Sequence, residues 1–147
     1  MIAGTLYNQL ITTLEGNSAL KKYVKYVYRG VRENIGDNAM PCLIIEPKQD
    51  GEFVEELNTY AKVYFSVDIV GYTFNASEPE RQIVGDDNYK GIVDFAQDLR
   101  ACLQSSNTLG DRCIDIRFEP TQFDFSEYPV RGFKLPIKIL YQQHNYV

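Results

Sequence analysis

The most restrictive feature of the sequence is a run of alternating apolar and polar residues between positions 59 and 72. Val63, Phe65, Val67 and Ile69 occupy every second position, and more polar side chains lie between them. Successive side chains of a strand point to opposite faces, so a period of two predicts a half-buried strand with one apolar face.

A second alternation, over residues 130–142, predicts another long strand, with Phe133, Leu135, Ile137, Ile139 and Tyr141 on one face. Pro136 lies inside this run, and because proline has no N–H to donate, it indicates a bulge or an edge position. Shorter strands are expected at residues 26–31, at 42–46 up to Pro47, and at 113–119 up to Pro120. Residues 122–125 form a short strand or a turn, and residues 49–58 form a hairpin loop or a strand extension.

Two segments have helical periodicity. Residues 2–25 carry an apolar stripe that Gly16 interrupts, with Asn17 or Ser18 able to cap a second short turn. Residues 89–105 form the other helix, for which Asp86, Asp87 or Asn88 supplies a cap. The sequence therefore predicts one α+β domain over residues 1–147. In it, a mostly antiparallel sheet of about 4–6 strands has two main helices packed on one face.

Composition restricts the possible ligands. The formal charge of −5 argues against general binding to nucleic-acid phosphates, which requires clustered Lys and Arg. A sparse basic group at Lys21, Lys22, Lys25, Arg29 and Arg32 is interpreted as the solvated end of a helix. The three cysteines lack metal-site spacing and are expected to be small buried hydrophobes in a reducing cytosol. No apolar run approaches the roughly 18 residues of a membrane span, so we expect a soluble protein.

Catalytic patterns are not found. His144, the single histidine, lies close to the C-terminus, where a catalytic residue is difficult to fix in place. Zinc ligand spacing and glycine-rich phosphate loops do not occur. The acidic pairs Glu55-Glu56 and Asp86-Asp87 are interpreted as solvated charges. We therefore predict a protein that is not an enzyme and that has no cofactor and no metal.

Aromatic residues are abundant instead, with eleven Tyr, eight Phe and no Trp. Many are expected to pack in the core, but several fall in predicted loops and at strand ends. Aromatic side chains are enriched in the cores of protein interfaces. Phe53, Phe74, Phe123 and Phe125 are therefore candidate contacts between subunits.

The order of these elements resembles the tail-terminator (tail-completion) proteins of long-tailed bacteriophages. The resemblance covers the opening helix, the strand Pro41-Cys42-Leu43-Ile44-Ile45-Glu46, the strand 63–72, the helix 89–103 and the closing hairpin of 114–118 with 130–141. It implies a subunit of a ring, commonly hexameric, at the head-proximal end of the tail tube. Such a ring ends tube polymerisation and joins the tail to the head connector, and genome DNA passes through its lumen without specific binding.

The resemblance implies that the partners are further copies of the chain, the tail-tube protein and the head-completion or connector protein, without a membrane. The protein is then located in the virion neck and made in the host cytoplasm. The segments 49–58, 73–88 and 121–128 are the expected assembly loops. Within them, Glu55, Glu56, Asp86 and Asp87 are expected to line a pore or to pair with Arg81 or Arg131 of a neighbouring copy.

Three other interpretations remain open. The chain could be another neck ring, such as a head-completion or connector protein. It could be a tail-tube subunit, although such proteins are usually all-β and the two helices count against this. In a different class, it could be a cytosolic binding domain or an enzyme whose site is not recognisable.

Overall fold

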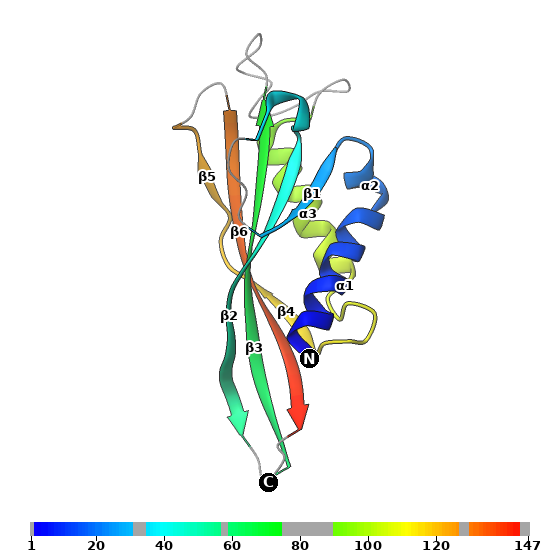
Figure 1. The fold of residues 1–147 in the computed structure, drawn as a ribbon, viewed down its shortest axis with the longest axis vertical. Helices are drawn as coiled ribbons and strands as arrows, with labels where there is room; N and C mark the ends of the chain where they lie inside the picture. The colour runs from blue at the N-terminus through cyan, green and yellow to red at the C-terminus, as the bar shows by residue number, and fades with distance from the viewer. Residues whose placement is uncertain (1, 31–34, 57–58, 75–89, 127–129, 145–147) are drawn as a thin grey trace.

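Three long antiparallel strands form the centre of the molecule: β2 (Cys42–Glu56), β3 (Tyr60–Phe74) and β6 (Val130–His144) (Figure 1). The short strand β1 (Tyr26–Arg29) pairs with β2 in parallel, while β4 (Asp115–Phe118) and β5 (Gln122–Asp124) both pair with β6. This computed structural model describes residues 2–30, 35–56, 59–74, 90–126 and 130–144. The six-stranded, mostly antiparallel sheet confirms the predicted fold class.

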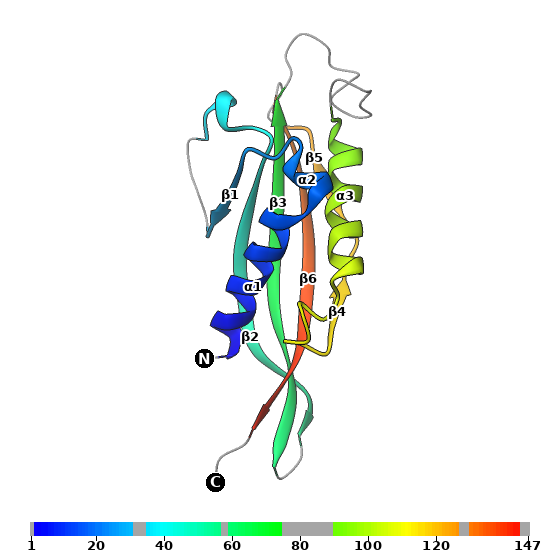
Figure 2. The ribbon, with the colours of Figure 1, turned by 90° about the vertical axis from the view of Figure 1, so that its right-hand side faces the viewer.

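The helices α1 (Ile2–Gly16), α2 (Ser18–Lys21) and α3 (Ile92–Ser105) lie together on one face of the sheet (Figures 1 and 2). The break between α1 and α2 follows the prediction, because the Asn17 side chain accepts hydrogen bonds from the backbone N–H groups of Ala19 (3.1 Å) and Leu20 (3.0 Å). The predicted caps of the other helix are wrong. α3 begins later than expected, directly after Gly91, whose carbonyl accepts from the Phe95 N–H at 2.9 Å.

The core lies between the helices and the sheet. The odd-numbered residues of β3 from Ala61 to Ile69 are all buried, and so are the five apolar residues predicted to share one face of β6. The rings of Phe95 and Phe133 meet edge to face with centroids 5.0 Å apart, joining α3 to β6. Both alternations in the sequence therefore mark the surface that the helices cover.

The strand β2 differs from the prediction. Pro47 was expected to end it, but the strand continues to Glu56 with register shifts at Pro47/Gln49, Asp50/Glu52 and Phe53/Glu55. Among the described residues, β1 pairs with β2 only as far as Ile45, so beyond that residue β2 is an edge strand in this part of the chain, where the missing N–H of a proline is tolerated. Of the two alternatives for residues 49–58, the strand extension is confirmed for residues 49–56.

Pro136 of β6 lies opposite the gap between the short strands β4 and β5. Its pairing with Asp68 of β3 shows no register shift, so the predicted bulge is wrong. Its carbonyl accepts from the Glu119 N–H at 3.0 Å, and in an antiparallel strand the N–H and C=O of one residue point to the same side. The absent N–H therefore points to the gap between β4 and β5, where neither strand needs it. β6 lies between β3 and these two strands, so Pro136 is not on an edge strand either.

The three cysteines are buried and form no disulfide, as predicted for small hydrophobes. Burial, together with the nearby Asp115 carboxylate, raises the pKa of Cys113 to about 11, and burial raises the pKa of Cys102. These thiols therefore stay protonated and poorly nucleophilic at neutral pH.

Gly71 provides a test of the packing between β3 and β6. It pairs with Phe133, and a Cβ at position 71 would overlap the Phe133 ring. We expect Gly71→Ala to lower the free energy of unfolding by ~1–3 kcal/mol, the usual cost of overpacking. Combining it with Phe133→Leu should give a loss smaller than the sum of the two single losses. Chemical denaturation measures both. Gly16→Ala, where nothing lies within 4 Å of the added Cβ, is the matched control. Additive losses would contradict the proposed overlap.

Candidate assembly surfaces

The ends of the central strands continue past the helices (Figures 1 and 2). We call the arm residues 51–56 of β2, 60–64 of β3 and 142–144 of β6, of which Gln143 and His144 still line a hollow with Ile2, Ala3 and Gly4 at the start of α1. The β2–β3 hairpin register places Glu52 opposite Tyr64, and the β3–β6 register places Lys62 opposite Gln142. The arm is thus a three-stranded ribbon that projects beyond the helical layer.

Side-chain bonds connect the strands at and near the arm. The Tyr141 hydroxyl donates to Asp50 Oδ1 at 2.8 Å, joining β6 to β2 across β3. Lys138 Nζ lies 3.1 Å from Glu52 Oε2 and also joins β6 to β2, but on the opposite face of the sheet. Lys62 Nζ lies 3.4 Å from Glu55 Oε2. Burial, together with the Asp50 carboxylate, raises the pKa of Tyr141, so its hydroxyl remains a donor at neutral pH.

The outer strand of the arm carries exposed apolar side chains. Phe53 is 56% exposed and Val54 is 52% exposed, and the acidic residues Glu55 and Glu56 follow directly. Within the described residues, no strand pairs with the outer edge of β2 beyond Ile45. Three predicted interface residues, Phe53, Glu55 and Glu56, therefore lie together at an unpaired sheet edge.

The other described candidates lie at the opposite end of the long strands. Phe123 and Phe125 flank Asp124 of β5, are 41% and 44% exposed, and stack with ring centroids 6.3 Å apart. Phe74 is half-buried at the end of β3, and Arg131 of β6 pairs with the neighbouring Thr73. We call this the β5 end. The remaining candidates, Arg81, Asp86 and Asp87, lie outside the described residues, as does most of the segment 73–88.

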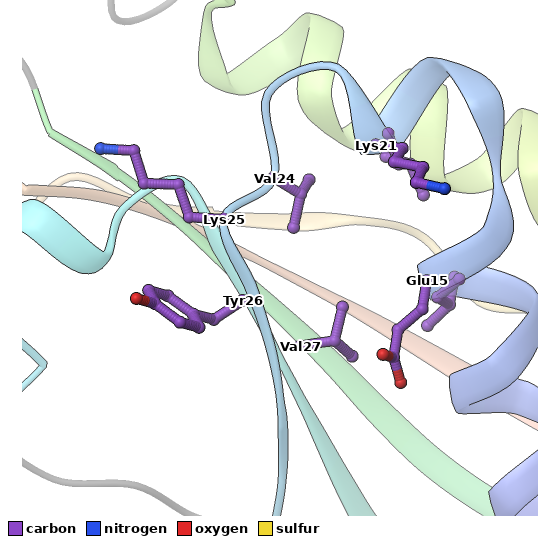
Figure 3. Close-up of a pocket in the computed structure, with 8 residues that line it drawn as sticks. Glu15, Lys21, Val24, Lys25, Tyr26 and Val27 are labelled. Carbon is purple, nitrogen blue, oxygen red and sulfur yellow. The ribbon is translucent and has the colours of Figure 1, made fainter.

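Beside β1, the structure has a hollow of about 210 Å³ that sequence reasoning did not predict. Val24 and Val27 point toward its helical side, where Glu15 and Lys21 lie, whereas Lys25 and Tyr26 point away (Figure 3). The basic residues just before β1 are the sequence feature that could have indicated this hollow. None of the predicted interface residues lines this hollow.

The sheet face opposite the helices carries charges of both signs. Lys48 Nζ lies 3.2 Å from Glu46 and 3.8 Å from Asp68, and Lys134 Nζ lies 3.9 Å from the same Asp68 carboxylate. With the Lys138–Glu52 pair, these contacts give several of the lysines on this face an acidic partner.

The described residues contain no group of three or more His, Cys, Asp or Glu side chains placed to hold a metal ion. His144 is exposed at the end of β6. In the same described part of the chain, every helix falls short of the length and apolarity needed to span a membrane. The unusual features of the described surface are therefore its edges and strand ends.

Comparison with known proteins gives a match in fold. No protein-family model matches the sequence, and no curated protein matches it. A chain in the structure of the virion of a native gene transfer agent (GTA) particle is similar, with a TM-score of 0.58 and 13% identity. The match covers 97% of this chain and 98% of that chain, so the two share a fold over almost their whole lengths.

The hydrogen bond between Tyr141 and Asp50 is expected to slow local opening at the base of the arm. Tyr141→Phe removes the donor, and we expect amide hydrogen exchange in residues 49–56 to accelerate about fivefold, because a hydrogen bond typically contributes about 1 kcal/mol. Mass spectrometry of exchanged peptides measures this. Tyr64→Phe, which removes a hydroxyl without a described partner, is the control and should leave the rate unchanged. Equal acceleration in both variants would contradict a specific role for the bond.

Proposed function

We propose that the chain is a structural protein of a phage-like virion, and specifically a tail terminator. The observation that carries the proposal is the placement of exposed apolar residues at two opposite ends of an extended sheet. A chain that shares the fold over nearly its whole length is part of a virion, which supports a structural role. The resemblance in element order supports the narrower assignment to the head-proximal end of a tail tube.

A ring needs lateral contacts between two unlike surfaces of one subunit, whereas the arm and the β5 end lie at opposite ends of the long strands and give it two unlike axial ends. Contacts between unlike surfaces propagate head to tail and close into a ring when the rotation between copies closes. In our proposal the ring is hexameric, one of its axial faces binds the tail-tube protein and the other binds the head connector. Because the two axial faces differ, a tube that has received the ring offers no further site for its own subunit.

The charges of the uncovered sheet face suit a DNA channel. If this face lines the lumen, Lys48 and Lys134 face the DNA with Asp68 within 4 Å of both. Binding to DNA gains free energy when unpaired Lys and Arg displace counterions from phosphates. Lysines already paired with carboxylates gain less, so DNA passes without being held.

This charge balance is testable with Asp68→Asn, which keeps the side-chain shape, removes the described acidic partner of Lys134 and leaves Lys48 with Glu46 alone. We expect the wild-type protein to retain no duplex DNA in a filter or mobility assay at about 150 mM salt, and the variant to bind DNA with an affinity that falls as salt increases. Asp111→Asn, on an exposed turn, changes the net charge equally and is the control. If both variants bind equally, net charge rather than the Asp68 cluster determines the result.

The terminator function is tested directly on tail tubes encoded by the same genome. We expect the purified protein to add a ring to one end of each tube in electron micrographs and to stop its elongation. Phe125→Asp should leave the ring intact but weaken one axial contact about tenfold or more, because burial of a Phe side chain contributes ~1.5–3 kcal/mol. Gln104→Asp, exposed on α3, adds the same charge elsewhere and should have no effect.

The same experiment separates the alternatives. A ring that binds head connectors but never caps tubes supports a head-completion protein, and elongation of tubes by the chain itself supports a tail-tube subunit. A protein that stays monomeric at high concentration and on tubes contradicts the ring proposal.

A further inference from the structure

One row of paired residues crosses the sheet at the base of the arm and has exposed apolar side chains at both of its ends. Phe53 of β2 pairs with Val63 of β3, and Val63 pairs with Tyr141 of β6. Ile114 lies beside the β6 end of this row, directly before β4, and its N–H donates to the carbonyl of Leu140, the residue before Tyr141, at 2.7 Å. Val63 and Tyr141 are buried, whereas Phe53 is 56% and Ile114 is 43% exposed.

Three of these side chains lie on the same face. Residues paired across strands point to the same side of a sheet, so Phe53 points to the side of the buried Val63 and Tyr141. Ile114 lies in the bend directly before β4 and is exposed. Phe53 and Ile114 are therefore exposed apolar residues at the two opposite edges of the sheet.

Ring symmetry makes this arrangement significant. In a closed ring all copies lie at the same height along the axis, so two surfaces that meet must lie at the same level of one subunit. The register places Phe53 and Ile114 at the same level. It places Phe53 and the β5 aromatics at opposite ends of the strands, so those two groups cannot meet within a ring whose axis follows the strands.

Strand direction also fits. β2 is antiparallel to β3, β3 to β6 and β6 to β4, so β2 and β4 run in opposite directions. If the β4 edge of one copy approaches the β2 edge of the next, the two edges meet in the antiparallel sense, which permits hydrogen bonding. Pro47 and the three register shifts limit the regular backbone on β2, so side chains must provide much of such a contact.

One pair of opposite charges lies near the two apolar ends. Glu55 and Glu56 follow Phe53 closely and are exposed, and Arg112, also exposed, lies two residues before Ile114. Glu55 already pairs with Lys62, whereas Glu56 and Arg112 have no ion-pair partner among the described residues. The acids Asp111 and Asp115 also lie beside Arg112 and Ile114. Asp115 pairs with Leu140, on the face opposite to Phe53, so Glu56 and Arg112 are the opposite charges that can meet.

We propose that a second copy of this chain covers the outer edge of the arm. Phe53 of one copy packs against Ile114 of the next, with Glu56 facing Arg112, and the contact repeats around the ring. The proposal rests on the ring function proposed above and identifies the lateral interface within it. The two surfaces are unlike, so each copy binds one neighbour through its Phe53 edge and another through its Ile114 edge. Every copy has both neighbours only when the ring is closed.

The contact is tested by disulfide cross-linking of the full chain carrying both Phe53→Cys and Ile114→Cys. The two positions lie on opposite edges of one molecule, so a bond can form only between copies, and the native thiols are buried. Under mild oxidation we expect a covalent ladder on a non-reducing gel that ends at the ring number. Phe53→Cys with Phe125→Cys, equally exposed but at opposite ends, is the matched control and should give no ladder.

A second measurement covers the case in which the cysteine variants do not assemble. Glu56→Arg or Arg112→Glu alone should raise the protein concentration needed for rings about tenfold or more, and the two together should restore it, as for a close interfacial charge pair. Light scattering measures ring formation in every sample. This interface is overturned if rings form without a ladder, if the control also gives a ladder, or if the two charge reversals do not rescue each other. Each of these results leaves the ring proposal standing. Failure of the wild-type protein to form rings, alone or on tubes, overturns the function itself.

Discussion

The structure depends on the pairing between β3 and β6. Fifteen consecutive pairs, from Tyr60 with His144 to Phe74 with Val130, form without a register shift. A slip of one residue would turn the buried side chains of either strand to the opposite face, so the apolar alternation fixes the register. β2 pairs with one side of this ladder and β4 and β5 pair with the other, while the helices cover its apolar face. The position of each exposed residue of the sheet along the strand direction therefore follows from this single register.

Sequence patterns predicted the parts of the fold that are buried on one face. β3 and β6 were expected within two residues of their observed ends, because each has a covered face that requires alternation. The Asn17 cap followed from a short-range hydrogen bond that the sequence displays directly. β2 was only partly predicted, since its second half is mostly exposed and pairs, within the described residues, with β3 alone. Its bulges remove the period of two on which the prediction relied.

The candidate surface was predictable in composition but not in geometry. Phe53, Glu55 and Glu56 were expected together because they are close in sequence, and the edge of β2 holds them together. Ile114 falls inside the strand expected over residues 113–119, but it lies before the first residue of β4 and is exposed. The alignment of Ile114 with Phe53 depends on two intervening strands and cannot be obtained from local pattern. Arg81, Asp86 and Asp87 remain predictions.

The arm has features that suit a subunit that must stay soluble before it assembles. An unpaired strand edge is an aggregation hazard, and Pro47, the register shifts and the charged residues of β2 are devices that discourage indiscriminate pairing. Exposed ion pairs such as Lys62–Glu55 stabilise a folded structure only weakly, by about 0–1 kcal/mol each, so the ladder rather than these pairs holds the arm. A contact that covers Phe53 would add apolar burial where the arm has none on its outer edge. In the proposed ring, the irregular backbone and charges of this edge thus disfavour pairing with unrelated strands. The neighbouring copy stabilises the edge because its apolar and charged groups match it.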